Sequence, residues 1–144
     1  MKQTNIKRLV IGLLSLIALI LIRNFETELF YDPLISYFKQ NYHNLPFPNT
    51  DYTLLYISYT VRFLLNSFFS IAILWNIFQK QAHLKIISII YLTFYIVLLL
   101  LLCYSLHFKA DNLQILIYTR RFLIHPILLL IFIGALFYQK RTTP

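Results

Sequence analysis

Four long apolar segments in a chain of 144 residues constrain its fold more than any other feature. They run over Leu9–Ile22, Leu54–Phe78, Ile86–Phe108 and Leu113–Tyr138, and charged residues fall almost wholly between them. The polar remainder of the chain is too short to cover so much apolar surface in water. We therefore expect lipid to be the solvent of these segments and the chain to be a polytopic membrane protein.

Segment lengths fit this interpretation. A helix needs about 20 apolar residues to cross a bilayer, and the last three segments meet that length. The first has 14 residues between Arg8 and Arg23, but basic side chains at its ends can reach the interfaces and lengthen the span. We expect one all-α membrane domain, a four-transmembrane-helix antiparallel bundle with spans at about 6–25, 54–78, 86–108 and 113–138.

A signal peptide is the alternative for the first segment, because a basic start and a short apolar stretch are typical of one. The sequence that follows, Arg23-Asn24-Phe25-Glu26, has no small-residue cleavage pattern. We expect a retained helix.

The net charge of +8 is arranged by side. Seven basic residues flank the segment ends on one side: Lys2, Lys7, Arg8, Lys80, Lys85, Lys140 and Arg141. All five carboxylates fall on the other: Glu26, Glu28, Asp32, Asp51 and Asp111. Because basic loops stay in the cytoplasm, this pattern predicts two cytoplasmic termini and explains the basic excess without nucleic acid.

Few residues suit a metal, a cofactor or covalent chemistry. The chain has one cysteine, its four histidines lack metal-ligand spacing, and its two glycines both lie within spans. A thiol enzyme would need Cys103 beside a base such as His125. Cys103 stands between Leu102 and Tyr104, where a thiol usually packs as a small apolar group. We expect no metal, no cofactor and no catalysis.

The longest link, Asn24–Thr53, is predicted to face away from the cytoplasm. Asp32-Pro33 is typical of a helix start, and the apolar pattern after it predicts a short interfacial helix. Prolines then exclude helix over Leu45–Asp51, and Thr50 or Asp51 caps the second span. Candidate docking residues in this link are Asp32, Pro33 and Phe47.

An internal repeat is the most specific signal. Residues 59–66, YTVRFLLN, match residues 118–125, YTRRFLIH, at five of eight positions. Each copy places a polar residue one turn after its aligned arginine, on the same helix face. Two interpretations stay open: arginines that anchor helices to lipid or pair with acidic residues of the link, and an anion- or partner-binding pocket. The candidate residues are Arg62, Asn66, Arg120, Arg121 and His125.

Two features suggest how the spans pack. Pro126 removes a backbone donor and predicts a kink in the fourth span. Small residues at Gly12, Ser15 and Ala18 share a face of the first span, and Gly134-Ala135 lies at a similar depth in the fourth. Because small residues permit close helix approach, we expect these two spans to touch.

The motifs together resemble a known family. They are residues 23–26 (RNFE), 29–33 (LFYDP), 62–66 (RFLLN), 121–126 (RFLIHP) and 138–140 (YQK). In these motifs, and in size and span count, the chain resembles the membrane proteins associated with exosortase F in flavobacteria-type bacteria. The signature blocks of the exosortase itself are absent, so no catalytic role passes to Cys103, Arg121 or His125.

This resemblance implies a non-catalytic accessory of protein sorting in the bacterial inner membrane. Its partner would be an exosortase, or the sorting substrate of that enzyme, docked through the outer link and the arginine faces. The alternative is a small transporter or lipid-handling subunit whose outer-leaflet arginines bind an anionic solute.

Overall fold

The computed structural model describes residues 2–40, 46–78, 81–108 and 113–142, and within these ranges every regular element is a helix. The helices are α1 (Lys2–Asn24), α2 (Glu26–Leu29), α3 (Leu34–Lys39), α4 (Tyr52–Phe78), α5 (Gln81–His107), α6 (Leu113–Ile124) and α7 (Ile127–Thr142). The all-helical prediction is confirmed. The predicted short links Gln79–Lys85 and Lys109–Asn112 lie partly or wholly outside the described residues, as does Leu45.

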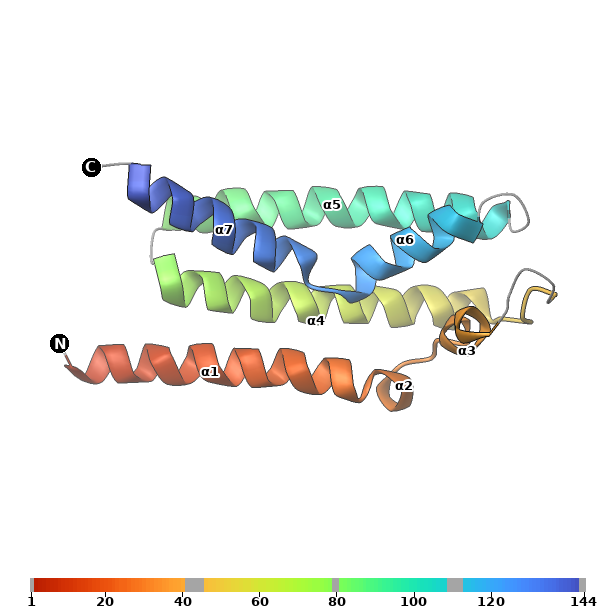
Figure 1. The fold of residues 1–144 in the computed structure, drawn as a ribbon, viewed down its shortest axis with the longest axis horizontal. Coiled ribbons are helices and arrows are strands. Elements are labelled where there is room, and N and C mark those ends of the chain that lie inside the picture. The colour runs from red at the N-terminus through yellow and green to blue at the C-terminus, as the bar shows by residue number, and fades with distance from the viewer. Residues whose placement is uncertain (1, 41–45, 79–80, 109–112, 143–144) are drawn as a thin grey trace.

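α1, α4 and α5 run side by side along one axis (Figure 1). α4 packs against α1, α5, α6 and α7, whereas the main contacts of α1 are with α4 and α2. α6 and α7 form a V whose apex lies near α4, and both chain ends lie at one end of the bundle (Figure 1). The opposite end, where α2 and α3 lie, is called the α3 end below.

Length and hydropathy qualify α4 and α5 as membrane spans. The pair α6 and α7 qualifies as a third, broken span with a bend of 63°. Many large apolar side chains point outward, among them Phe68 at 67% exposure and Leu130 at 70%. A water-soluble protein rarely exposes such continuous apolar surface, so this surface supports a membrane protein with two or three spans in the described part of the chain.

The bend falls at Pro126, where the sequence predicts a kink. Proline has no backbone N–H, so α6 ends at Ile124 and α7 begins at Ile127. The N–H of Ile127 donates to the His125 carbonyl at 2.8 Å, closing a tight turn between the two helices. The fourth predicted span is therefore two helices and not one.

The small-residue face of α1 packs on α4. An added Cβ at Gly12 would lie 3.9 Å from the Asn76 Cβ, and Ser15 is buried. Gly134 in α7 has open space around it. The expected close approach between the first and fourth spans is therefore wrong, because α4 supplies the partner surface for α1.

The core lies between α4, α5 and the α6–α7 pair, with α3 covering its end. Leu34, Leu55, Leu74, Leu102 and Leu123 are almost fully buried in it. The short predicted helix is confirmed as α3, and the buried Leu34 and Tyr37 turn one of its faces toward the bundle. Phe47 packs its ring against Tyr37, with centroids 5.7 Å apart.

Two leucines on α5 test this packing. Leu102→Ala removes a side chain with no exposed surface and should lower the free energy of unfolding by about 2–5 kcal/mol. Leu100→Ala, at 62% exposure on the same helix, should change it by about 0.5 kcal/mol or less. Unfolding followed in mixed micelles measures both, and equal losses would contradict the burial pattern.

Candidate functional site

Asp32 is the centre of the polar cluster at the α3 end. Its side chain has no exposed surface, and it lies between α2 and α3. Arg62 Nη1 donates to Asp32 Oδ2 at 3.1 Å. Arg120 donates to the same oxygen from Nε at 3.1 Å and from Nη2 at 3.0 Å. The Tyr59 hydroxyl donates to Asp32 Oδ1 at 3.0 Å.

One carboxylate therefore joins three parts of the chain. Arg62 and Tyr59 come from α4 and Arg120 from α6, while Asp32 belongs to the link between α1 and α4. Arg62 is 1% exposed, and a guanidinium this deeply buried requires a counter-charge and hydrogen bonds. Asp32 supplies the charge, and the Glu26 carbonyl accepts from Arg62 Nη2 at 2.9 Å.

Aromatic rings complete the surroundings of both guanidinium groups. The Phe30 ring centroid lies 4.7 Å from the Arg62 guanidinium carbon, and the Phe38 centroid lies 5.9 Å from that of Arg120. Such contacts attract a cation to the face of the ring. The cluster therefore resembles a structural contact between segments more than an open anion site. We call Asp32, Tyr59, Arg62 and Arg120 together the Asp32 joint.

Asp32 does not act as the helix cap that its place before Pro33 predicts. α3 starts at Leu34 after Pro33, with no side-chain cap. The Asp32 backbone carbonyl accepts from the Ile35 N–H at 3.2 Å, while its carboxylate bonds to the arginines. At α4, by contrast, Asp51 Oδ1 accepts from the N–H groups of Thr53 and Leu54, which identifies Asp51 as the cap.

In the second copy of the repeat, the arginine that contacts Asp32 as Arg62 does is Arg120. The alignment of the repeat matches Arg62 with Arg121. Arg121 is exposed, whereas Arg120 lies mostly buried against Asp32. Burial does place Arg62 and Asn66 on one inward face of α4, as expected. The alignment of the two repeat copies could not identify the buried arginine, because Arg120 and Arg121 are adjacent and the alignment matches Arg62 with the wrong one.

Asn66 stabilises the break between α6 and α7. Its Nδ2 donates to the Ile124 carbonyl at 2.6 Å. In an unbroken helix this carbonyl would accept the N–H of residue 128, so the break frees it and Asn66 satisfies it. The predicted polar residue one turn after Arg62 thus has a structural role.

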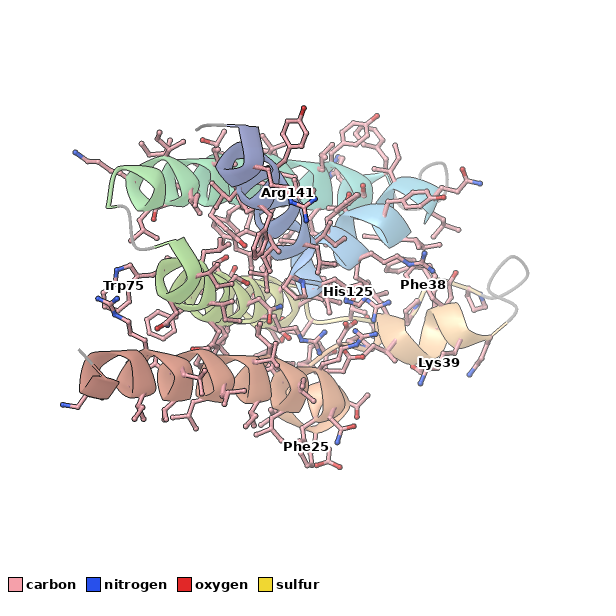
Figure 2. All side chains as sticks on the ribbon, turned by 60° about the vertical axis from the view of Figure 1, so that its left-hand side comes forward. Phe25, Phe38, Lys39, Trp75, His125 and Arg141 are labelled. Carbon is pink, nitrogen blue, oxygen red and sulfur yellow. The ribbon has the colours of Figure 1, made fainter. Side chains whose placement is uncertain are left out.

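His125 lies at the same break. Its ring contacts Arg23 of α1. Arg23 Nη1 is 3.2 Å from His125 Nδ1 and donates to Glu26 Oε2 at 2.9 Å. A guanidinium can only donate, so Nδ1 accepts and the ring proton is on Nε2. In Figure 2 His125 is labelled near the middle of the bundle, and Phe25 is labelled at the edge of α1 that lies away from the other helices.

A pocket of about 810 Å³ opens between α1, α4 and the α6–α7 break. We call it the lateral groove. Its polar end is formed by Arg23, Glu26, Arg62, Asn66 and His125, and apolar residues of α1 and α7 form its walls. Sequence analysis missed Arg23 and Glu26 as site residues, although two opposite charges three residues apart are a signal for an ion pair.

Cys103 lies elsewhere. It is exposed and lines a small hollow with Tyr52, Tyr56 and His107, whereas His125 lines the lateral groove. The structure therefore does not bring Cys103 and His125 together. Among the described residues no group of three or more metal-binding side chains forms.

Removing the charge of Asp32 should destabilise the protein strongly. Asp32→Asn leaves two arginines without their counter-charge and should lower the free energy of unfolding by about 3–5 kcal/mol. Glu28→Gln, an exposed acidic residue of the same link, should have almost no effect. Because the groups share contacts, Asp32→Asn with Arg120→Gln should cost less than the two changes added separately. Additive costs would contradict the joint.

Asn66→Ala should lower the free energy of unfolding by about 1–3 kcal/mol, because the Ile124 carbonyl loses its donor. Asn76→Ala is the matched control on α4. The Asn76 side chain bonds to the Ala72 carbonyl four residues earlier in its own helix, which the backbone already satisfies. If both variants unfold alike in mixed micelles, Asn66 does not hold the break.

Comparison with family models, characterised proteins and solved structures finds no match to this chain. Function must therefore be inferred from the Asp32 joint, the surface at the α3 end and the lateral groove.

Proposed function

We propose that this protein is a non-catalytic accessory of an exosortase-type protein-sorting system in a bacterial inner membrane. In this proposal α1 also crosses the membrane, which makes four spans, and both termini lie in the cytoplasm. The α3 end then faces outward, where it docks an exosortase or the substrate of that enzyme. The motifs that carry the family resemblance support the choice of partner, because two of them supply Asp32 and Arg62.

The observation that carries the proposal is the fixed position of the link between α1 and α4. Asp32 ties this link to α4 and α6 at one buried point. Three large side chains of this link, Phe25, Leu29 and Tyr31, remain exposed, with Leu29 at 62%, and together they are called the apolar patch. A preorganised surface with aromatic anchors loses little entropy when a partner binds, which favours docking.

The span assignment of α1 has support of its own. It is 23 residues long and packs along α4, and its other side exposes leucines and isoleucines, including Leu9 at 65%. That surface suits lipid. Arg23 at one end and Arg8 at the other bracket the apolar stretch, as expected for side chains that reach the two interfaces.

A second candidate function is a lipid-handling subunit. The alternative expected from the sequence, an anionic solute on paired arginines, is weakened because Arg62 and Arg120 both already donate to the buried Asp32 carboxylate. The broken span favours lipid handling by another route, since discontinuous helices commonly border binding sites in membrane proteins. This candidate depends on the lateral groove and not on the arginine pair.

Affinity purification of the tagged protein from its native membranes in mild detergent tests the sorting role. We expect an exosortase in near-stoichiometric amount. Leu29→Asp should abolish its recovery by placing a charge in the apolar patch. Thr27→Asp adds the same charge two residues earlier in α2 and should keep the partner. Recovery of the folded protein alone, or equal loss in both variants, would contradict docking through this patch.

A further inference from the structure

We propose that the lateral groove binds one phospholipid with a singly charged phosphodiester headgroup. The headgroup lies at the polar end, beside Arg23 and His125, and an acyl chain lies between α1 and α7. This inference does not rest on the sorting role, because the groove and the apolar patch are separate surfaces.

The size and walls of the groove fit an amphiphile. Its volume of about 810 Å³ lies within the range of about 300–1,000 Å³ that ligand pockets usually have. Leu16, Leu19 and Ile20 of α1 form one wall, and Leu129 and Leu130 of α7 form the other. Leu130 is 70% exposed at the rim, so the groove is open on the side that faces lipid.

The polar end carries N–H donors of Arg62, His125 and Arg23. Arg62 Nε is buried and has no hydrogen-bond partner in the described part of the chain. His125 accepts from Arg23 through Nδ1, which leaves its Nε2–H as a second donor toward a ligand. Arg23 has further N–H groups besides the one bonded to Glu26 and His125. Unmet donors in a partly enclosed site favour an anionic oxygen ligand.

The charges agree with a single negative charge on the ligand. Glu26 pairs with Arg23, while Asp32 alone serves both Arg62 and Arg120. Among these five side chains one positive charge is therefore left over. A phosphodiester carries one negative charge, so its headgroup balances this excess, and a zwitterionic lipid supplies no net charge to do so.

The break between α6 and α7 makes the site possible. The fourth span is bent by 63° at Pro126, whereas a straight helix would continue along the line of α6. The bend turns α7 away from the line of α6, and Ile124 and His125 at this bend border the groove. Asn66, which bonds to the Ile124 carbonyl, fixes this end.

Photo-crosslinking tests the proposal on the full-length protein in phosphatidylcholine nanodiscs. The probe is phosphatidylglycerol with a diazirine in one acyl chain. We expect labelled peptides from 16–22 of α1 and 127–130 of α7, with unlabelled phosphatidylglycerol competing about tenfold better than phosphatidylcholine. Labels spread over all lipid-facing helices, with equal competition, would show ordinary boundary lipid and overturn the proposal.

Two variant pairs assign the parts of the site. Arg23→Gln should remove the roughly tenfold preference for phosphatidylglycerol, whereas Arg141→Gln, an exposed arginine near the end of α7 and outside the groove, should keep it. Ile20→Trp fills the apolar wall and should abolish labelling, while Leu100→Trp on the exposed side of α5 should not. An unchanged preference in Arg23→Gln would overturn the headgroup assignment.

Inorganic phosphate distinguishes a lipid from a free anion. It is an anion with the same kind of oxygen acceptors as the headgroup, but it has no acyl chain to fill the walls. We expect millimolar phosphate to leave the labelling of α1 and α7 unchanged. Displacement of the probe by phosphate would show a free-anion site and contradict lipid binding.

Discussion

The buried carboxylate of Asp32 is the interaction on which the rest of the structure depends. Two arginines in a mostly apolar bundle are costly without a counter-charge, and Asp32 supplies one to both. Because Asp32 is in the link, Arg62 in α4 and Arg120 in α6, one cluster fixes three segments that are distant in sequence. The position of α3 follows from this joint, as does that of the link that carries the apolar patch.

A second constraint is the break between α6 and α7, next to the Asp32 joint. Pro126 breaks the last apolar segment, and Asn66 satisfies the carbonyl that the break leaves free. The result is a bend that separates α7 from α1 and leaves a groove with donors at one end. Arg62 belongs to both regions, since its Nη atoms bond to the Asp32 joint and to Glu26, while its Nε has no partner.

Sequence patterns predict the helices well and their mutual arrangement less well. Apolar length identifies α4 and α5, and Pro126 identifies the bend, because both are local properties. Which helix packs on the Gly12 face of α1 depends on the tertiary arrangement of the helices, and local sequence does not specify that arrangement. The same holds for Arg120: its pairing with Asp32 requires a contact over 88 residues, and the repeat points to its neighbour Arg121. The family resemblance stays a prediction.

The most direct measurement is an experimental structure of the protein in lipid nanodiscs, obtained by cryo-electron microscopy with a bound antibody fragment for size. We expect the Asp32 carboxylate between the guanidinium groups of Arg62 and Arg120, with the bend at Pro126 retained. Asp32 facing solvent, with both arginines turned into the lateral groove or toward lipid headgroups, would contradict the joint from which the outer surface and the groove are derived.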